Sequence, residues 1–311
     1  MAERPSVIVV ASTMVDMTCY VDRAPVAGET VVGNDFALGF GGKGANQAVM
    51  AGRLGCSVEL AACLGDDVFA DMALDHYRRE GLDLRHVHRI AGVSSGVAPI
   101  WVDTTGENRI VIVPGANDHL SPTHVTDAVT GATHVDVVLS QMEVPQETTF
   151  AAFEAARHRG ASTILNPAPA RTPIDGLLDL CDWLIVNETE FADLFAGYVA
   201  KGAGPRDEDL LAAATTLKGS LVVTLGAAGA VVVEGSQIQR VPASAVDDVV
   251  DTTGAGDAFV GAFTYMIGAG HSAAQAAQVA CACAGVSVTR RGTQSSFPDA
   301  MEAAGLLRSC T

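Results

Sequence analysis

Short, continuously apolar segments alternate with helical stretches along most of this sequence. The first covers residues 7–11, and later examples cover 135–139, 183–186 and 221–224. Strands that are apolar without a break are typical of parallel sheets, because helices cover both faces of such a sheet. Parallel neighbours are joined by crossover connections, which are almost always right-handed. The sequence therefore predicts an α/β fold built on a mainly parallel sheet.

Two stretches break this alternation. Residues 18–32 mix β-branched residues with proline and glycine, which favours short strands over a helix. The strands expected at 97–102 and 109–113 are joined by a polar loop that contains glycine, which is typical of a hairpin. We therefore expect a small β-sheet lid, built from about residues 17–36 and 96–113, that projects from the main body.

Charge and cysteine content narrow the functional classes. The formal net charge is -17, whereas a nucleic-acid partner demands clustered Lys and Arg. The seven cysteines are scattered without a C-x-x-C pair, so neither a zinc site nor a disulfide framework is expected. The apolar run at 7–11 is too brief for a signal sequence or a membrane span. We therefore expect a cytoplasmic protein with no nucleic-acid or membrane partner. Because no repeat or linker divides the chain, we expect a single domain over residues 1–311.

One glycine-rich segment, Asp-Thr-Thr-Gly-Ala-Gly-Asp at 251–257, enters a stretch that is apolar on every side and predicts a buried helix. The backbone N–H groups of Gly254, Ala255 and Gly256 can approach a ligand closely, and a helix N-terminus suits an anion. Asp257 stands where this helix begins, so its carboxylate could act as a base toward a hydroxyl. An N-cap aspartate after a glycine turn is the alternative.

A second glycine-rich segment, Gly-Gly-Lys-Gly at 41–44, stands at a strand-to-helix junction. Its backbone could hold a substrate, with Lys43 and Asn46 as hydrogen-bond donors. Residues 39–44 also match Gly-x-Gly-x-x-Gly, but no strand of a Rossmann unit precedes them closely. A P-loop is excluded because glycine follows Lys43. A tight turn that carries a solvated lysine is the alternative.

Polar or glycine-rich groups follow several expected strands. Asp16 comes just past the first strand, Glu143 follows a later one, Asn187 begins a polar cluster after another, and residues 224–229 are rich in glycine. Open α/β sheets bind ligands at the carboxyl ends of their strands. Taken singly, these groups could be a solvated strand end, an N-cap or a hairpin turn. Their convergence on one edge indicates a ligand site.

Together these segments resemble the ribokinase (PfkB) family of sugar kinases. Residues 41–48 and 251–257 are similar to its two defining motifs. Further family segments match in order and spacing at 166–170, 187–190, 224–226 and 288–292. The resemblance, from about residue 7 to about residue 298, implies a three-layer α/β/α ribokinase-like fold with a mainly parallel central sheet and a small β-sheet lid.

The resemblance also implies an activity. An enzyme of this kind would use ATP, with Mg²⁺ and K⁺, to phosphorylate the 5-hydroxyl of D-ribose. Asp257 would be the general base, and Gly254, Ala255 and Gly256 would form the anion hole for the transferring phosphoryl group. The lid would close over the sugar and also form the contact of a homodimer.

The remaining site residues follow from the same resemblance. Residues that would hold the sugar hydroxyls are Asp16, Gly42, Lys43, Asn46 and Glu143. Those that would face the nucleotide are Asn187, Thr224, Gly226, Gly229, Gly256 and Cys281, the last of these where ribokinases often carry a polar residue. Mg²⁺ would be bound through water by Glu190. A monovalent cation would be surrounded, mostly by carbonyl oxygens, at Asp251, Thr253, Ser287, Arg290, Gly292 and Ser296.

One position departs from the family pattern. Ribose-specific members usually carry Asn two residues before the first-strand aspartate, and this chain has Met14. A thioether is a poor hydrogen-bond partner, and a buried hydroxyl without a partner costs about 1–3 kcal/mol. We hypothesise that Met14 favours a sugar that lacks one hydroxyl, such as 2-deoxy-D-ribose. The alternatives are a core methionine that touches no ligand, a related nucleoside or hexose kinase, and a sugar-binding regulator without catalysis.

Overall fold

The computed structural model describes residues 4–198 and 204–310. Within them a nine-stranded sheet runs in the order β13-β12-β11-β10-β9-β8-β1-β4-β5. The strands from β11 to β5 pair in parallel, and β12 and β13 extend one edge antiparallel. The mainly parallel sheet predicted from the apolar runs is therefore confirmed. Its strands are β1 (Ser6–Val10), β4 (Ser57–Leu64), β5 (Val87–Arg89), β8 (Val137–Gln141), β9 (Ser162–Asn166), β10 (Trp183–Asn187), β11 (Ser220–Thr224), β12 (Ala230–Glu234) and β13 (Gln237–Val241).

The apolar runs are buried on both faces of this sheet. In β1, Val7 and Val9 pack into one hydrophobic core, and Ile8 and Val10 pack into the other. Side chains alternate between the faces of a strand, so only an unbroken apolar run can fill both cores. Burial of apolar area in two cores is the main driving force that stabilises this arrangement.

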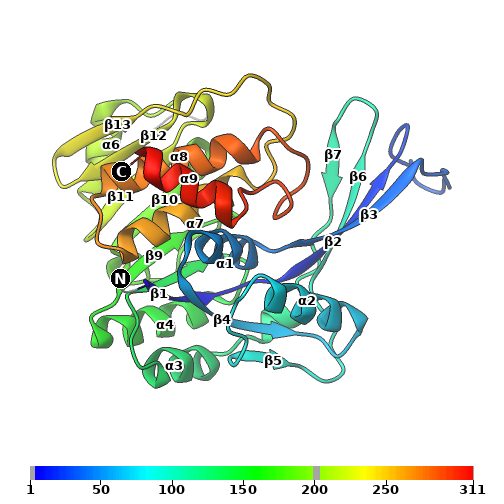
Figure 1. Ribbon diagram of the computed structural model, residues 1–311, viewed down its shortest axis with the longest axis horizontal. Coiled ribbons are helices and arrows are strands. Elements are labelled where there is room, and N and C mark those ends of the chain that lie inside the picture. Colours follow the sequence, from blue (N-terminus) through cyan, green and yellow to red (C-terminus); the bar gives the residue numbers. More distant parts are fainter. Residues whose placement is uncertain (1–3, 199–203, 311) are drawn as a thin grey trace.

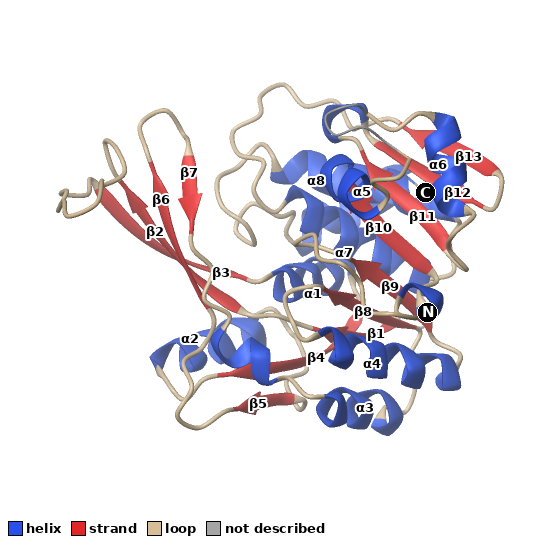
Figure 2. Ribbon diagram, turned by 180° about the vertical axis from the view of Figure 1, so that it is seen from behind, coloured by secondary structure: helices blue, strands red, loops and turns tan. Residues whose placement is uncertain are grey.

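Helices cover the two faces and complete three layers (Figures 1 and 2). One face is covered by α1 (Lys43–Leu54), α2 (Val68–Arg79), α7 (Ala255–Gly268), α8 (Ala273–Ser287) and α9 (Ala300–Cys310). The other is covered by α3 (Pro122–Gly131), α4 (Gln146–Arg159), α5 (Glu188–Leu194) and α6 (Asp207–Ala214). Helix α7 is apolar around most of its surface, as expected, because it lies between α1 and α8 as well as on the sheet.

A second sheet, with the strand order β3-β2-β6-β7, projects from the main body on the right of Figure 1. Its strands are β2 (Met14–Tyr20), β3 (Asp35–Gly41), β6 (Val97–Val102) and β7 (Asn108–Ile110). β2 pairs antiparallel with β3 and parallel with β6, and β6 pairs antiparallel with β7. The sheet is attached where β1 ends, because β2 begins only four residues after the last residue of β1.

The strand boundaries in this small sheet differ from those expected. No strand lies within the described residues 21–34, so the short strands expected over 18–32 are found only at their beginning, in β2. Pro25 has no N–H to donate, and Gly28 adopts a φ of 80°, so this segment forms a loop between β2 and β3 instead. At the other hairpin, β7 ends at Ile110, and Val113 makes only an isolated bridge.

Strands β5 and β13 were not expected from the sequence, because residues 87–89 and 237–241 carry too many polar residues to form an apolar run. All seven cysteines are free thiols. Within residues 4–198 and 204–310, none of the helices has the length and apolar character needed to cross a membrane.

Candidate active site

The N-termini of α1 and α7 lie side by side and form the centre of the site. Each helix begins after a glycine with a positive φ, Gly42 at 88° and Gly254 at 79°. A Cβ atom at Gly42 would lie 2.8 Å from the carbonyl oxygen of Ser12, and one at Gly254 would lie 2.8 Å from Cγ2 of Thr293. A Cβ at Gly261 of α7 would lie 2.5 Å from the carbonyl oxygen of Gln47. Glycine therefore permits both turns and the close approach of the two helices.

Asp257 lies in the first turn of α7 and is 7% exposed. The side-chain amide of Asn46 donates to its Oδ2 at 2.8 Å, and that of Gln47 donates to its Oδ1 at 2.9 Å. The N-cap of the helix is Gly254, which makes no side-chain cap. The N-cap interpretation of Asp257 is therefore wrong: its carboxylate faces α1 and is fixed by two neutral donors.

Four further charged groups lie near this carboxylate. Burial raises the pKa of Asp16, on β2, to about 6, and the charges of Glu143 and Asp257 add to the effect. Burial alone would lower the pKa of Lys43, but the attraction of Asp257, Glu143 and Glu190 outweighs it and raises that pKa. Lys43 is half-buried, and the nearby carboxylates favour its ammonium form.

Glu143 connects three segments at this edge of the sheet. Its Oε2 accepts the hydroxyl of Ser12 at 2.7 Å and the backbone N–H of Lys43 at 2.9 Å. The hydroxyl of Ser12 in turn accepts the backbone N–H of Gly44 at 3.2 Å. A carboxylate therefore already occupies the positive end of α1. Of the two helix N-termini, that of α7 is the one left to receive another anion.

The small sheet brings Met14 and Asp16 to the same site. The two residues are two apart on β2, so their side chains share one face. Gly41 is the cross-strand neighbour of Met14, and a Cβ there would clash with the carboxylate of Asp16. Met14 is 4% exposed. Just before it, the side chain of Asn117 bonds both the N–H and the carbonyl of Thr13, at 2.8 and 2.9 Å.

The expected nucleotide residues fall into two groups. Asn187 and Thr224 are direct neighbours at the ends of β10 and β11. Asn187 caps α5, with Glu190 completing a capping box through bonds of 2.8 and 3.0 Å. Gly226 and Gly229 form the turn of an antiparallel hairpin between β11 and β12. The cap and the hairpin, which the sequence left as alternatives, are thus both present. Cys281 is on α8, where burial raises the pKa of its thiol to about 11.

The expected cation residues lie at the end of α8, where Ser287 is the last residue, and in two loops that Asp251 holds together. Its Oδ1 accepts the N–H of Thr253 at 2.9 Å, and its Oδ2 accepts that of Gly292 at 3.0 Å. The hydroxyls of Ser287 and Ser296 donate to carbonyls within their own turns, and Arg290 bonds Glu302 at 3.0 Å. Among the described residues, no cluster of three or more His, Cys, Asp or Glu could hold a metal ion.

Sequence reasoning missed a set of buried amides that surround Asp257. Gln47, Gln141, Asn166 and Gln294 are all buried and hydrogen-bonded to one another or to residues of the site. Gln141 and Asn166 end β8 and β9, so the strand-end pattern that indicated Glu143 could have found them. Gln294 stands in an irregular loop, where no periodic signal marks a buried polar residue.

Comparisons with known proteins agree with this geometry. A model of the pfkB family carbohydrate kinase matches residues 4–300. A deoxyribokinase of Salmonella typhimurium is 38% identical over 299 residues, which cover 94% of this chain and 95% of that protein. A ribokinase of Haemophilus influenzae is 34% identical, over 96% of this chain and 97% of that protein. The structure of Arabidopsis thaliana ribokinase complexed with ribose and ATP matches with a TM-score of 0.87, at 28% identity, over 98% of this chain and 99% of that chain. The ribokinase-like fold is thereby confirmed.

Proposed function

Because the chain belongs to the pfkB family of carbohydrate kinases, we propose that it transfers the γ-phosphoryl group of ATP to the 5-hydroxyl of a pentose, D-ribose or 2-deoxy-D-ribose. The observation that carries this proposal is the buried carboxylate of Asp257, fixed at both oxygens beside the open N-terminus of α7. Phosphoryl transfer depends on positioning and charge stabilisation rather than covalent chemistry by the protein. A fixed base next to backbone donors supplies both.

The N-terminus of α7 has room for a phosphoryl group. Apart from the helix's own backbone, no described heavy atom lies within 4 Å of a Cβ placed on Gly256. Protein packing therefore does not require glycine at this position, whereas a ligand that approaches the backbone would. The first N–H groups of a helix have no intrahelical acceptor, so those of Gly256 and Asp257 are suited to phosphoryl oxygens.

Asp257 would act as the general base. The sugar oxygen forms a bond to the γ-phosphorus while the bond from phosphorus to ADP breaks, and the hydroxyl proton passes to the carboxylate of Asp257. A free aspartate has a pKa near ~3.9, far below that of an alcohol, so it accepts the proton late in the reaction. Lys43, Asn46, Asp16 and Glu143 surround the same space and would bind the other sugar hydroxyls.

The family implies ATP and Mg²⁺, and the acidic residues fit a weakly held Mg²⁺. Glu190 is half-buried near Lys43 and Asp257, and burial raises its pKa. A single carboxylate suits Mg²⁺, which usually keeps several waters and takes its other ligands from substrate phosphates. When bound, the ion neutralises charge on the phosphates. Asn187, Thr224, Gly226, Gly229 and Cys281 would line the nucleotide side.

A specific residue favours 2-deoxy-D-ribose as the sugar. Met14 shares one face of β2 with Asp16, and the family pattern implies that its thioether would stand where ribose-specific members have an amide for a sugar hydroxyl. The deoxyribokinase of Salmonella typhimurium is 38% identical to this chain. A sugar without its 2-hydroxyl leaves no unpaired polar group beside a thioether.

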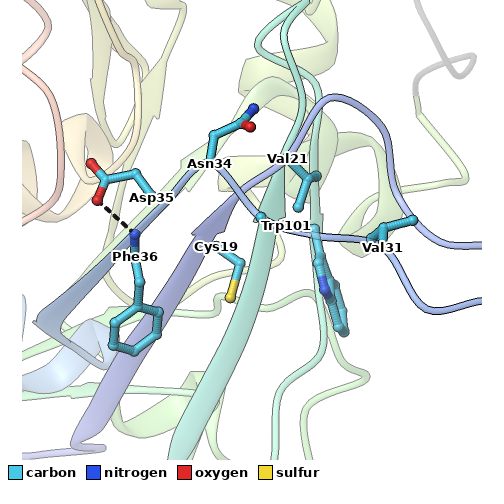
Figure 3. A pocket seen from close by; sticks show the side chains of 8 residues that line it. Cys19, Val21, Val31, Asn34, Asp35, Phe36 and Trp101 are labelled. Carbon is cyan, nitrogen blue, oxygen red and sulfur yellow. Dashed lines mark hydrogen bonds between the residues drawn. The ribbon is translucent and has the colours of Figure 1, made fainter.

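We also propose that the small sheet is a lid within a single kinase domain, and that it pairs with the lid of a second copy. Cys19, Phe36 and Trp101 form one cross-strand row, and Phe36 is 53% exposed. They line a cavity of about 430 Å³ near the outer end of the sheet (Figure 3). Exposed aromatic and aliphatic side chains around a hollow are typical of a surface that another protein covers.

A monovalent cation is the last element of the proposal. The loops at 251–254 and 290–296 are already tied by Asp251, and a Cβ placed on Gly254 would lie 2.8 Å from Cγ2 of Thr293, so the second loop lies against the turn that begins α7. Burial alone would raise the pKa of Asp251, but the bonds from Thr253 and Gly292 outweigh it and lower that pKa. A K⁺ ion bound by these carbonyls would fix the turn that begins α7.

The base role predicts the behaviour of Asp257→Asn. We expect kcat to fall by about 10²–10⁴-fold, because the amide cannot accept the proton. Calorimetry should still show sugar binding. Asp248→Asn, in an exposed loop, is the control and should retain full turnover in an ADP-release assay. Near-normal kcat for Asp257→Asn would refute the base assignment. Sugar binding by the unmodified protein without any ADP release would favour a regulator instead.

The sugar preference predicts the behaviour of Met14→Asn. The unmodified protein should have a higher kcat/KM for 2-deoxyribose than for ribose. Met14→Asn should shift this ratio toward ribose by about 5- to 100-fold, as one buried hydrogen bond is worth. Met17→Asn lies on the opposite face of β2 and should leave the ratio unchanged. A strong preference of the unmodified protein for ribose would contradict the hypothesis. Higher rates with nucleosides or hexoses would show that the substrate is not a pentose.

The cation proposal predicts faster turnover in KCl than in NaCl at the same ionic strength. K⁺ would order the anion-hole turn, so the effect should be on kcat more than on the sugar KM. The ADP-release assay with each salt measures this. Equal rates in both salts would contradict the proposal.

The dimer proposal predicts a dimer of the unmodified protein in sedimentation velocity. Phe36→Glu should give monomers, because it buries a charge in the apolar contact. Met301→Glu changes a side chain on α9 that is 82% exposed, and this variant should remain dimeric. A monomeric unmodified protein at micromolar concentration would rule the contact out.

A further inference from the structure

A chain of buried amides joins the central sheet to Asp257, and from it we infer that Gln47 is a positioning residue for the general base. This inference rests on the proposed function, in which Asp257 accepts the sugar proton. Nε2 of Gln47 donates to Oδ1 of Asp257 at 2.9 Å and to Oδ1 of Asn166 at 3.0 Å. Nδ2 of Asn166 then donates to the backbone carbonyl of Ile185, on β10, at 2.9 Å.

The direction of this chain is fixed by its last member. A backbone carbonyl can only accept, so Asn166 must turn its NH₂ toward Ile185 and its oxygen toward Gln47. Gln47 must therefore present its NH₂ to Asn166 and to Asp257. Its oxygen accepts Nε2 of Gln141 at 2.6 Å, which agrees with the same orientation. Asp257 thus always faces a donor that is anchored in the sheet.

The other oxygen of Asp257 is held by a separate arm. Asn46 donates to Oδ2, and its own oxygen accepts Nε2 of Gln294 at 2.9 Å. Oε1 of Gln294 lies 2.7 Å from Nε2 of His76 on α2. Burial lowers the pKa of His76, so the neutral ring must carry its proton on Nε2 to complete this arm.

Two donors, one at each oxygen, fix the plane of the carboxylate. With Asn46 alone, the group could rotate about its Cβ–Cγ bond. In the proposed site Asn46 also faces the sugar, whereas Gln47 is fully buried and is directed only at Asp257, Asn166 and Gln141. Gln47 therefore holds the base in the same orientation whether or not sugar is bound, which is the preorganisation that proton transfer requires.

A donor to the charged form of a carboxylate also lowers its pKa. The charged groups that interact with Asp257 are Asp16 on β2, Lys43 on α1 and Glu190 on α5, with Glu143 beside the first two. Loss of the Gln47 donor leaves these charges in place. The acid limb of kcat should then move to higher pH, because a hydrogen bond to the ionised form of the general base is lost.

The experiment compares Gln47→Met with Gln141→Met in the full-length chain. Both remove a buried amide of equal size, but only Gln47→Met removes a donor to Asp257, because Gln141 bonds Gln47. For Gln47→Met we expect kcat to fall about 10- to 100-fold, with little change in the sugar KM. Its acid limb should rise by about 1–2 pH units, as expected for one hydrogen bond to a charged group. For Gln141→Met the acid limb should stay in place.

Two further variants keep the outcomes distinct. Gln47→Leu also removes the donor without adding a charge, and it carries the test if Gln47→Met does not fold. It should likewise move the acid limb to higher pH, because the same hydrogen bond to the ionised base is lost. An acid limb and kcat equal to those of Gln141→Met, in a protein that Asp257→Asn inactivates, would overturn the role of Gln47. Activity retained in Asp257→Asn would instead overturn the proposed function on which this inference rests.

Discussion

The bonds from α1 to the carboxylate of Asp257 are the interaction on which the site depends. Two helices begin at the same point, and each directs the positive end of its dipole there. Glu143 satisfies the first turn of α1, and Asp257 is held by the side chains of Asn46 and Gln47. Protein groups thus bond the first N–H groups of α1, whereas the first N–H groups of α7 are left for a ligand. In the proposed function, this division would separate the place where the sugar is held from the place where phosphoryl charge develops.

Such a site is costly to the folded state. Glu143, Glu190 and Asp257 lie around the ammonium group of Lys43, and the pKa of the nearby Asp16 rises to about 6 because burial and like charges disfavour its ionised form. An isolated fold would be more stable with fewer buried carboxylates. The family comparison explains why they are kept, since a polar substrate with several hydroxyls needs acceptors that water does not occupy. Clustered carboxylates with a perturbed pKa of this kind are typical of functional sites.

The parts of the structure that could be predicted from the sequence are those with a periodic or local signal. Unbroken apolar runs identified β1, β8, β10 and β11, because only strands buried on both faces need them. Strand ends and glycine turns brought Asp16, Glu143 and Asp257 to one edge. Polar edge strands such as β5 and β13 gave no such signal. Gln294 and Asn117 were missed because their importance comes from partners far away in the sequence, Asn46 and Thr13.

The junction between β3 and α1 has a mechanical consequence. The strand ends at Gly41 and the helix begins at Lys43, so one residue separates the projecting sheet from the helix whose side chains bond Asp257. A single residue gives little freedom for that sheet to move independently of α1. The ring of Phe40 also stacks on the ring of His76, with the ring centroids 4.1 Å apart. A displacement of this sheet would therefore reach α1 directly, and with it Asn46 and Gln47, whose side chains hold Asp257. In the proposed function, closure of this sheet over a sugar would thus adjust the same side chains that position the base.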